Sequence, residues 1–559
     1  ATPSMAVQAP SLNNAPIISS TGSFGVSTGK LLSVNTGDWT DSPTGYTYQW
    51  YRCTSSLSAT STDPSNCQIV SGSTASTHRL SRSDTGFYMV AKVTATNALG
   101  STYTYSASTV QVRQANSTAN SYAFLCQLRT GRLYCAGGNG GANSPQGQLV
   151  GSVSFGGIQK TFFGPVALKD GTVLTDLVSI AGSDYNVCVI NIAGNVFCNG
   201  NANSGMFTDG FGTGQRQLFT QMNASAGVPI TGATSIAVTD NSYCFTKVTA
   251  GVSNVWCAGT GVNGQMAQSN VGVQTYPVKA MVSSGVALTG ALQVVGGSLN
   301  TGNGGTYCAL VSDGTTVGAK IYCWGMNNFA QLGQGDTTAR STYMTALTVN
   351  GSTTGFSYIT TGVSTCAIQN SGLFCWGGDN VGQLGQGSTS TTVRLTPTVP
   401  SNTAAGVSFA ANNGWVQVEV SDSSASTTAH VCALNVTGAV YCSGYNTWQQ
   451  LDQGAAGGTT SLSTFKATVD WTSGVADIDL ADSSSCAYLP ATGAFSCIGN
   501  NTYGQWGNGT TTSITNNAAA LTTPAGTLGS NPAIPSVLTT TISGNNATAS
   551  TLTQTSTWL

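Results

Sequence analysis

The chain has 559 residues, of which only 17 are Lys or Arg and 19 are Asp or Glu, so its formal net charge is −2. A charged fraction of 6% is far below the roughly 25% of ordinary globular domains. A nearly neutral chain without a basic patch argues against nucleic-acid binding, and no segment approaches the ~20 apolar residues of a membrane-spanning helix.

Residues 1–113 are expected to form a small β-sandwich with an N-terminal tail. Their strand-like segments resemble those of bacterial immunoglobulin-like domains on secreted proteins, in which Trp50 would pack in the core. Cys53 and Cys67 are only 14 residues apart, so they are expected to clamp one hairpin rather than join two sheets. His78 is expected at the surface of this domain.

The rest of the chain repeats one pattern seven times, and each copy contains a close pair of cysteines. The first cysteines of successive copies are 62, 56, 64, 58, 66 and 54 residues apart. Short apolar stretches alternate with Gly, Asn, Ser and Thr, without a helical period. Such a unit fits a four-stranded antiparallel sheet that stacks on its neighbours in a ring. The pairs are Cys126 with Cys135, Cys188 with Cys198, Cys244 with Cys257, Cys308 with Cys323, Cys366 with Cys375, Cys432 with Cys442 and Cys486 with Cys497.

The fourth and fifth copies carry the clearest motif. It reads Cys308-Ala309-Leu310, Cys323-Trp324-Gly325 and Gln331-Leu332-Gly333 in one, and Cys366-Ala367-Ile368, Cys375-Trp376-Gly377 and Gln383-Leu384-Gly385 in the other. This pattern resembles the repeat of the regulator-of-chromosome-condensation family, from about residue 115 to the C-terminus. The resemblance implies an all-β fold with a seven-bladed β-propeller, assigned to residues 114–529. Within it, Trp324 and Trp376 are expected to pack between blades.

The first copy lacks the apolar lead-in strand that precedes later copies, because residues 116–123 are short and polar. A strand-like stretch at 537–544 is found instead in the tail, residues 530–559. The tail could complete the first blade and close the ring, which would remove an open sheet edge. Alternatively, it could add a strand to a neighbouring molecule. We favour ring closure.

All sixteen cysteines have a nearby partner, which indicates eight local disulfides and an extracellular location. Zinc binding is disfavoured, because the chain has no Cys-x-x-Cys pair and only two histidines. The start at Ala1 is interpreted as the mature end left after a secretion signal is removed. Seven Asn-x-Ser/Thr sequences are possible glycosylation sites: Asn116, Asn223, Asn350, Asn435, Asn500, Asn508 and Asn546.

No catalytic residue, cofactor or resident metal is expected. His430 directly precedes a repeat cysteine pair and is expected to be structural. Asp477, Asp479 and Asp482 cluster on one lead-in strand. A solvated or blade-edge pair of Asp477 and Asp479 is the favoured interpretation there, and a calcium site is the less favoured alternative.

Three aromatic residues follow the repeat less regularly and are expected to contact a partner: Trp448, Tyr503 and Trp506. Two functions remain open. The first is a cell-surface structural protein that associates with copies of itself in a filament, sheath or surface layer, which low charge favours. The alternative is a secreted module, an adhesin or inhibitor, that recognises a protein or glycan. Nucleotide exchange, which the resemblance implies for intracellular relatives, and enzymatic activity are not expected.

Overall fold

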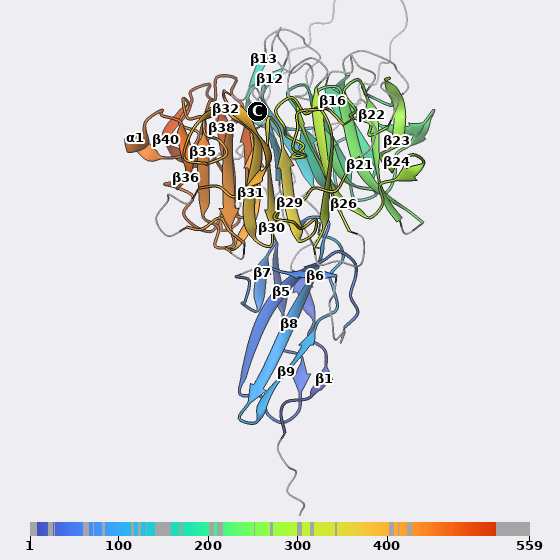
Figure 1. Cartoon of the computed structure of the whole chain (residues 1–559), viewed down its shortest axis with the longest axis vertical. Coiled ribbons are helices and arrows are strands. Elements are labelled where there is room, and N and C mark those ends of the chain that lie inside the picture. The colour runs from blue at the N-terminus through green and yellow to red at the C-terminus, as the bar shows by residue number, and fades with distance from the viewer. Residues whose placement is uncertain are drawn as a thin grey trace, which may run out of the picture.

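The computed structural model describes residues 8–20, 26, 28, 30–59, 66–70, 72–80, 84–112, 117–120, 124–129, 131–139, 158–166, 168, 172–200, 206–209, 216–250, 252–268, 272–298, 304–312, 318–340, 344–401, 407–411, 413–421, 427–492 and 494–520. Almost all regular structure within these ranges is β-strand. Figure 1 shows a small front part below a wider ring of sheets.

The front part folds into two facing sheets and one short strand pair, with orders β6-β5-β8-β9, β2-β3-β7 and β1-β4. Leu32, Trp50, Met89 and Val93 are buried between the two larger sheets, and Trp50 therefore lies in the core as expected. The strands are β1 (Leu12–Asn14), β2 (Ile18–Ser20), β3 (Leu31–Val34), β4 (Asp38–Trp39), β5 (Gly45–Cys53), β6 (Cys67–Ile69), β7 (Thr77–Arg79), β8 (Tyr88–Asn97) and β9 (Gly100–Tyr105).

Seven sheets follow in chain order within the described residues, and each consists of consecutive antiparallel strands. Sheet 1 contains β10 (Ser117–Asn120), β11 (Phe124–Arg129), β12 (Arg132–Asn139) and β13 (Ile158–Pro165), and sheet 2 contains β14 (Leu177–Gly182), β15 (Asn186–Asn191), β16 (Val196–Gly200) and β17 (Arg216–Gln221). Sheet 3 contains β20 (Ala233–Val238), β21 (Ser242–Thr249), β22 (Val252–Gly259) and β23 (Gln274–Lys279), and sheet 4 contains β26 (Ala291–Ser298), β27 (Gly305–Val311) and β28 (Lys320–Gly325). Sheet 5 contains β29 (Phe356–Thr361), β30 (Ser364–Gln369), β31 (Gly372–Asp379) and β32 (Ser390–Thr398). Sheet 6 contains β33 (Trp415–Val420), β34 (His430–Asn435), β35 (Val440–Gly444) and β36 (Leu462–Ala467), and sheet 7 contains β37 (Asp477–Ala481), β38 (Ser484–Leu489), β39 (Ala494–Gly499) and β40 (Ile514–Ala520).

Short elements lie in the connections between and within these sheets. Sheet 4 has single β-bridges where a fourth strand would lie, from Gly325 to Arg340 and from Tyr322 to Ala346. The additions are the hairpin β18 (Asn223–Ser225) with β19 (Val228–Pro229), the hairpin β24 (Met281–Ser283) with β25 (Val286–Ala287), and the short helix α1 (Gly454–Gly457).

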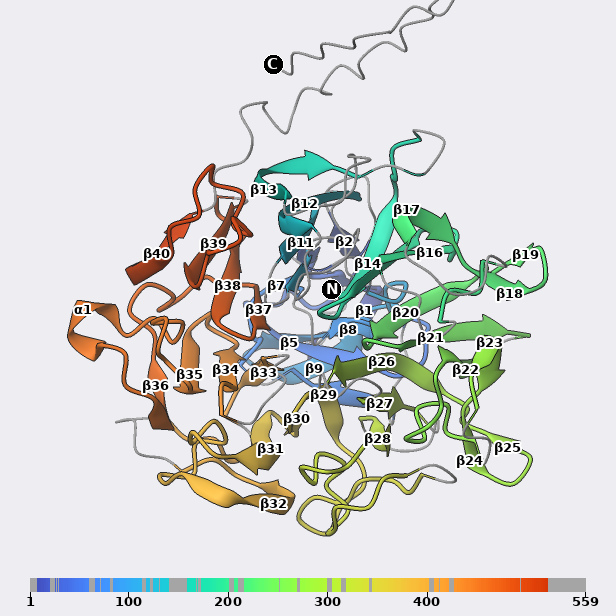
Figure 2. The same ribbon diagram turned by 90° about the horizontal axis from the view of Figure 1, so that it is seen from above.

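The first strands of the seven sheets surround a common axis (Figure 2). Each of these strands neighbours the first strand of the next sheet, and β37 of sheet 7 neighbours β10 of sheet 1. Apolar side chains fill the space between successive sheets. Each sheet therefore buries its faces against its neighbours, which a single sheet could not do alone.

Strand β10 corrects the expectation about the first repeat. Ser117–Asn120 pairs antiparallel with β11, with Ala119 opposite Cys126, so this polar segment itself supplies the first strand of sheet 1. The sequence argument failed because it required an apolar lead-in, whereas this polar segment pairs along β11 through its backbone and contributes the buried side chain of Ala119. The tail that was expected to fill this place, residues 530–559, lies outside the described residues.

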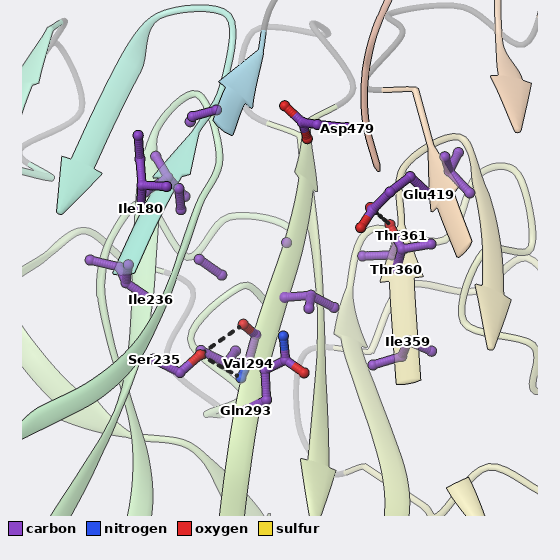
Figure 3. A pocket seen from close by; sticks show the side chains of 18 of the residues that line it. Ile180, Ser235, Ile236, Gln293, Val294, Ile359, Thr360, Thr361, Glu419 and Asp479 are labelled. Carbon is purple, nitrogen blue, oxygen red and sulfur yellow. Dashed lines mark hydrogen bonds between the residues drawn. The ribbon is translucent and has the colours of Figure 1, made fainter. Parts of the chain in front are cut away.

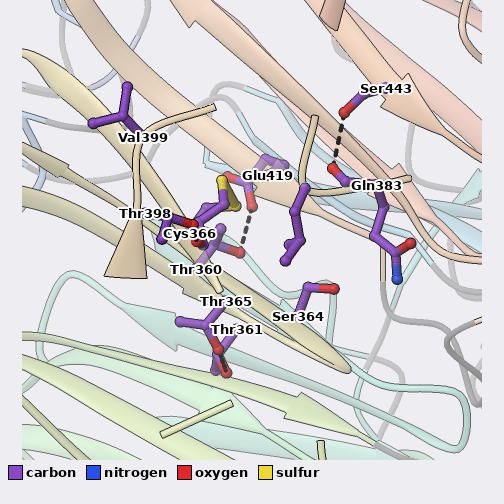
Figure 4. Close-up of a disulfide and its surroundings, with 12 residues drawn as sticks. Thr360, Thr361, Ser364, Thr365, Cys366, Gln383, Thr398, Val399, Glu419 and Ser443 are labelled. Atoms are coloured by element: carbon purple, nitrogen blue, oxygen red, sulfur yellow. Dashed lines mark hydrogen bonds between the residues drawn. A yellow bond between two sulfur atoms is a disulfide. The ribbon is translucent and has the colours of Figure 1, made fainter. Parts of the chain in front are cut away.

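All eight expected disulfides are present and all are local. Cys53 and Cys67 join β5 to β6 within one sheet of the front part. The other seven join the second strand of a sheet to its third strand, as for Cys366 and Cys375 between β30 and β31. Each disulfide thus clamps one hairpin, and Figure 4 shows the one at Cys366.

The front part packs against one end of the ring. Phe87 is fully buried among Leu292, Leu310 and Phe356 of sheets 4 and 5. Gln68 Nε2 donates a hydrogen bond to the Gly355 carbonyl at 2.8 Å. This end carries the starts of the first strands. The third strands run parallel to the first strands and therefore end at the opposite face of the ring (Figure 1). No described residue of the front part covers that face, and we call it the uncovered face in this sense.

Candidate interaction surface

The Gln-Leu-Gly motifs form tight loops after the third strands, on the uncovered face. In each loop the glutamine Oε1 accepts the backbone N–H of the residue two positions before it, at 2.9–3.1 Å. In four loops an Asn or Asp side chain also accepts the N–H at the motif's leucine position. The glutamines are Gln265, Gln331, Gln383, Gln450 and Gln505.

These bonds place one side chain of each loop at the same position in successive sheets. In sheets 4 to 7 that residue is apolar or aromatic, and we call Phe329, Val381, Trp448 and Tyr503 the loop row. Trp448 is 36% exposed, and the other three side chains are partly exposed. The equivalent residue in sheet 3 is the polar Asn263. The loop row is therefore an apolar arc over one half of the uncovered face.

Tryptophans of the Cys-Trp-Gly motif join neighbouring sheets, as the sequence predicts. The indole Nε1 atoms of Trp324 and Trp376 donate to the carbonyl of the motif glutamine in the preceding sheet, at 2.8 and 2.9 Å. In sheet 6 this place is taken by Ser443, whose Oγ donates to the Gln383 carbonyl at 2.8 Å (Figure 4). The Ser443 hydroxyl thus supplies the buried donor in place of the indole, and the hydrogen bond to the glutamine carbonyl is kept.

The prediction that Trp506 contacts a partner is wrong. Trp506 is fully buried and packs with Leu125 and Ala136 of sheet 1 and Phe495 of sheet 7. It stands at the motif's leucine position, where Leu332 and the other copies are also buried. Trp506 therefore fills the junction between the last sheet and the first. Of the three predicted contacts, Trp448 and Tyr503 do lie on the uncovered face.

Comparison with solved structures identifies the fold. Human WBSCR16 is 16% identical, with a TM-score of 0.53, and the match covers 70% of this chain and 95% of that protein. Prp20p from Saccharomyces cerevisiae, described with its binding properties to Gsp1p and histones, is 14% identical with a TM-score of 0.47 over 62% of this chain and 77% of its own. The fold is a β-propeller of the regulator-of-chromosome-condensation type. PorZ, a surface component of the type-IX secretion system of Porphyromonas gingivalis, is 9% identical with a TM-score of 0.36 over 74% of this chain and 38% of its own. No protein-family model and no curated protein matches the chain.

Two loops of the uncovered face of the propeller hold carboxyl groups with raised pKa values. Burial raises the pKa of Asp379 to about 6, although Arg394 lies 3.5 Å away. Burial raises that of Asp452 to about 7. Asp452 replaces the first glycine of the motif at a φ of 50°, and its Oδ2 accepts the N–H of Asp470 at 2.9 Å. Both carboxyl groups are fully buried, and this burial is the main cause of the raised pKa in each.

Both histidines are buried and hydrogen-bonded to side chains inside the protein. His430 is fully buried between sheets 6 and 7, where its Nε2 lies 2.9 Å from Ser485 Oγ. The expectation that His78 lies at the surface is wrong. His78 is bonded to Ser73 at 2.8 Å and to Asp84 at 3.2 Å, and Asp84 is also paired with Arg52 at 2.6 Å. This network lies inside the front part and fixes the turn that carries Phe87.

The acidic cluster of sheet 7 is only partly solvated. Asp477 is buried, and its Oδ1 accepts a hydrogen bond from Gln417 Nε2 at 2.8 Å, so this member of the expected pair is not solvated. Asp482 accepts a hydrogen bond from Thr428 Oγ1 at 3.0 Å. Within the described residues, no group of three or more His, Cys, Asp or Glu could hold a metal ion. Nor is any helix in that part of the chain long and apolar enough to span a bilayer.

The possible glycosylation sites differ in accessibility. Asn350 is exposed at the end of a short turn. Asn500 is 2% exposed, and its Oδ1 accepts the backbone N–H of Thr502 at 2.9 Å. Glycosylation at Asn500 therefore does not fit the folded chain. Asn223, Asn435 and Asn508 are partly buried, and Asn116 and Asn546 lie outside the described residues.

Replacement of His430 by Gln should remove one component of the pH dependence of stability. Burial lowers the pKa of His430 to about 3 from its ordinary value of 6.5, so below pH 6.5 the unfolded chain binds a proton that the folded chain does not. This contribution to stability is complete above pH 6.5 and falls by about 1.4 kcal/mol per pH unit as the pH decreases toward 3. Asp379 and Asp452 have raised pKa values and act in the opposite direction between about pH 4 and 7. Chemical unfolding of wild type and His430→Gln at pH 7 and pH 5 measures this contribution, because the two proteins differ only at the histidine. If the difference in unfolding free energy between the two proteins is the same at both pH values, the assignment is contradicted.

Proposed function

We propose that this chain is an extracellular binding protein whose seven sheets are the blades of one propeller and whose front part is an immunoglobulin-like spacer. The division into residues 1–113, 114–529 and a tail of 530–559 belongs to the same proposal. Eight local disulfides support an extracellular or cell-surface location, because such bonds persist in oxidising compartments. A partner protein is the favoured ligand, and a surface glycan is the alternative.

The loop row is the observation that carries this proposal. The front part covers one end of the ring through Phe87 and Gln68, and its described residues leave the opposite face open to a partner. Trp448 and Tyr503 stand there on loops that are fixed by internal hydrogen bonds. Rigid aromatic anchors of this kind supply most of the binding energy in many protein interfaces, and fixed loops lose little entropy on binding.

The double substitution Trp448→Ala with Tyr503→Ala should weaken partner binding by about 100-fold, because each anchor contributes about 1–2 kcal/mol. The partner is obtained by affinity capture from the extracellular fraction and cell surface of the source organism. Its affinity for wild type and variant is then measured by biolayer interferometry. Val252→Ala, an exposed apolar side chain of a hairpin at the covered end, is the matched control. Equal affinities for wild type and the double variant would disprove the assignment to the loop row.

Self-association in a filament, sheath or surface layer is the second candidate. The hairpins β18–β19 and β24–β25 lie at the rim of the ring (Figure 2), and Val228 and Val286 near their turns are 53% and 52% exposed. A chain of net charge −2 has little repulsion between copies. Negative-stain images of native material distinguish the two candidates: regular polymers that are lost on Val228→Asp with Val286→Asp support self-association, and single rings favour the binding module.

A further inference from the structure

The junction between sheets 7 and 1, where the ring closes, contains a buried guanidinium and a buried amide. Alternation along β11 places Leu125, Gln127 and Arg129 on one face of sheet 1. Leu125 packs on that side against Phe495 and Trp506 of sheet 7. Gln127 and Arg129 are only 1% and 6% exposed. Two strongly polar side chains therefore lie between the last sheet and the first.

Arg129 has one whole side of its guanidinium without a partner. Its Nε and Nη2 atoms are buried and form no hydrogen bond in the described part of the chain. These two atoms lie on the same side of the group, and together they bind the two oxygens of a carboxylate in the usual bidentate geometry. Unpaired buried donors are costly and rare in folded proteins, so this side of Arg129 is suited to an acceptor that the chain does not supply.

No carboxyl group of the described residues balances the charge of Arg129. Its Cζ lies 5.0 Å from the centre of the Phe495 ring. Burial lowers the pKa of Arg129 to about 10, and the groups that oppose this shift are the phenols of Tyr488 and Tyr134. Buried charges in proteins are normally paired. The missing counter-charge indicates that an anion binds here.

Gln127 is a second, separate indication of a ligand. Its Nε2 is also a buried donor without a partner among the described residues. Residues two apart on a strand lie about 6–7 Å apart on the same face, so the side chains of Gln127 and Arg129 can reach one ligand. Three unpaired donor atoms on one face favour a group that carries oxygen acceptors.

We propose that the junction between sheets 7 and 1 binds a carboxylate. Nε and Nη2 of Arg129 bind its two oxygens, and Gln127 Nε2 donates a third hydrogen bond. A bidentate carboxylate lies in the plane of the guanidinium, which itself lies over the Phe495 ring. The two groups thus form one flat layer between the sheets, and a tetrahedral phosphate or sulfate is thicker than this layer. The positive charge of Arg129 excludes a cation.

The site opens at the end of the ring that carries the front part. As a second strand, β11 ends there at Arg129, and the neighbouring phenols of Tyr134 and Tyr488 are partly exposed. Rotation of a phenol gives a ligand access to the buried side of Arg129, and side-chain movements of this kind are common on binding. The loop row lies at the opposite end of the ring. Substitutions there should leave the carboxylate site unchanged, so its failure and the failure of the proposed function can be told apart.

Saturation-transfer difference NMR of the full chain with propionate tests the proposal. Binding is expected for propionate and not for propionamide, which has the same shape without charge, nor for the tetrahedral methylphosphonate. Arg129→Met should weaken propionate binding at least about tenfold, and Gln127→Met about three- to tenfold, as expected for charged and neutral hydrogen bonds. The control Lys466→Met removes an exposed positive charge from the outer strand of sheet 6 and should leave the affinity unchanged.

Gln127→Glu supplies the missing carboxylate from within the chain. It should abolish propionate binding and raise the midpoint of thermal unfolding, because the new carboxylate pairs with a buried charge that has no partner. A lower midpoint together with retained propionate binding would contradict the proposed geometry.

The same chemistry is offered by two sources, a free organic acid and an acidic side chain of a bound protein. Competition of propionate by an aspartate-containing peptide supports the site and identifies a protein side chain as a source, whereas lack of competition leaves the free acid as the ligand. The proposal is overturned if wild type does not bind propionate at millimolar concentration, or if propionamide or methylphosphonate binds equally well. These results need no variant, so they hold even if a substitution impairs folding.

Discussion

Reduction of the eight disulfides should unfold the ring at 37 °C. Each bond closes a loop of 9 to 15 residues, and in the chain-entropy model such a loop stabilises the folded state by about 3 kcal/mol. Measured values are often smaller and are not additive, yet half of the summed effect, about 12 kcal/mol, equals the whole stability of a typical domain.

Circular dichroism during heating, with and without a thiol reductant under mild denaturant, measures this effect. The oxidised protein in the same denaturant is the control, because it reports the stability of the sheets with their hairpins clamped. We expect the midpoint of the unfolding transition of the reduced protein to lie below 37 °C. A reduced protein that unfolds within about 5 °C of the oxidised one would show that packing between sheets stabilises the ring without its disulfides.

Replacement of Trp376 by Ala should lower the free energy of unfolding by about 3–5 kcal/mol. The side chain is fully buried between sheets 4 and 5 and bonds to the Gln331 carbonyl at 2.9 Å. Gly333 shows how closely it is packed, because a Cβ at that glycine would lie 2.6 Å from Trp376 Nε1. The substitution opens a cavity and removes the bond between the two sheets.

Guanidinium unfolding of the oxidised protein checks this value. Trp448→Ala is the matched control, because it removes the same side chain from the uncovered face and should change stability by no more than about 0.5 kcal/mol. Trp376→Phe retains most of the apolar area and should have an intermediate cost. Similar losses of unfolding free energy for Trp376→Ala and Trp448→Ala would contradict the distinction between a tryptophan that packs between sheets and one that is available to a partner.

The repeat made much of this fold predictable. Cysteines 9 to 15 residues apart fit a bridge across one hairpin. Trp324 and Trp376 recur once per repeat because the same space between sheets recurs. Trp506 was misjudged although its sequence, Gly504-Gln505-Trp506-Gly507, places it at the motif's leucine. The motif position, which is buried in sheets 3 to 7, is a better guide than the usual preference of tryptophan for interfaces.

Other features depend on contacts that the sequence does not display. Strand β10 is polar, and its place is set by pairing with β11 and by contact with β37. His78 is stabilised in its buried position by Asp84, which also pairs with Arg52. These residues come together only when the front part folds. A cavity between the first strands of the sheets is lined by Gln293 of sheet 4, Glu419 of sheet 6 and Asp479 of sheet 7 (Figure 3). Contacts between residues so far apart in the sequence leave no local sequence pattern.

Mass spectrometry of unreduced protein from its natural source tests the central claim most directly, that this is an extracellular ring of individually clamped sheets. Proteolytic peptides should show eight bridges, each between the two cysteines of one hairpin, and no free thiol. Free cysteines, or bridges that join different sheets, would contradict both the location and the architecture from which the binding function is inferred.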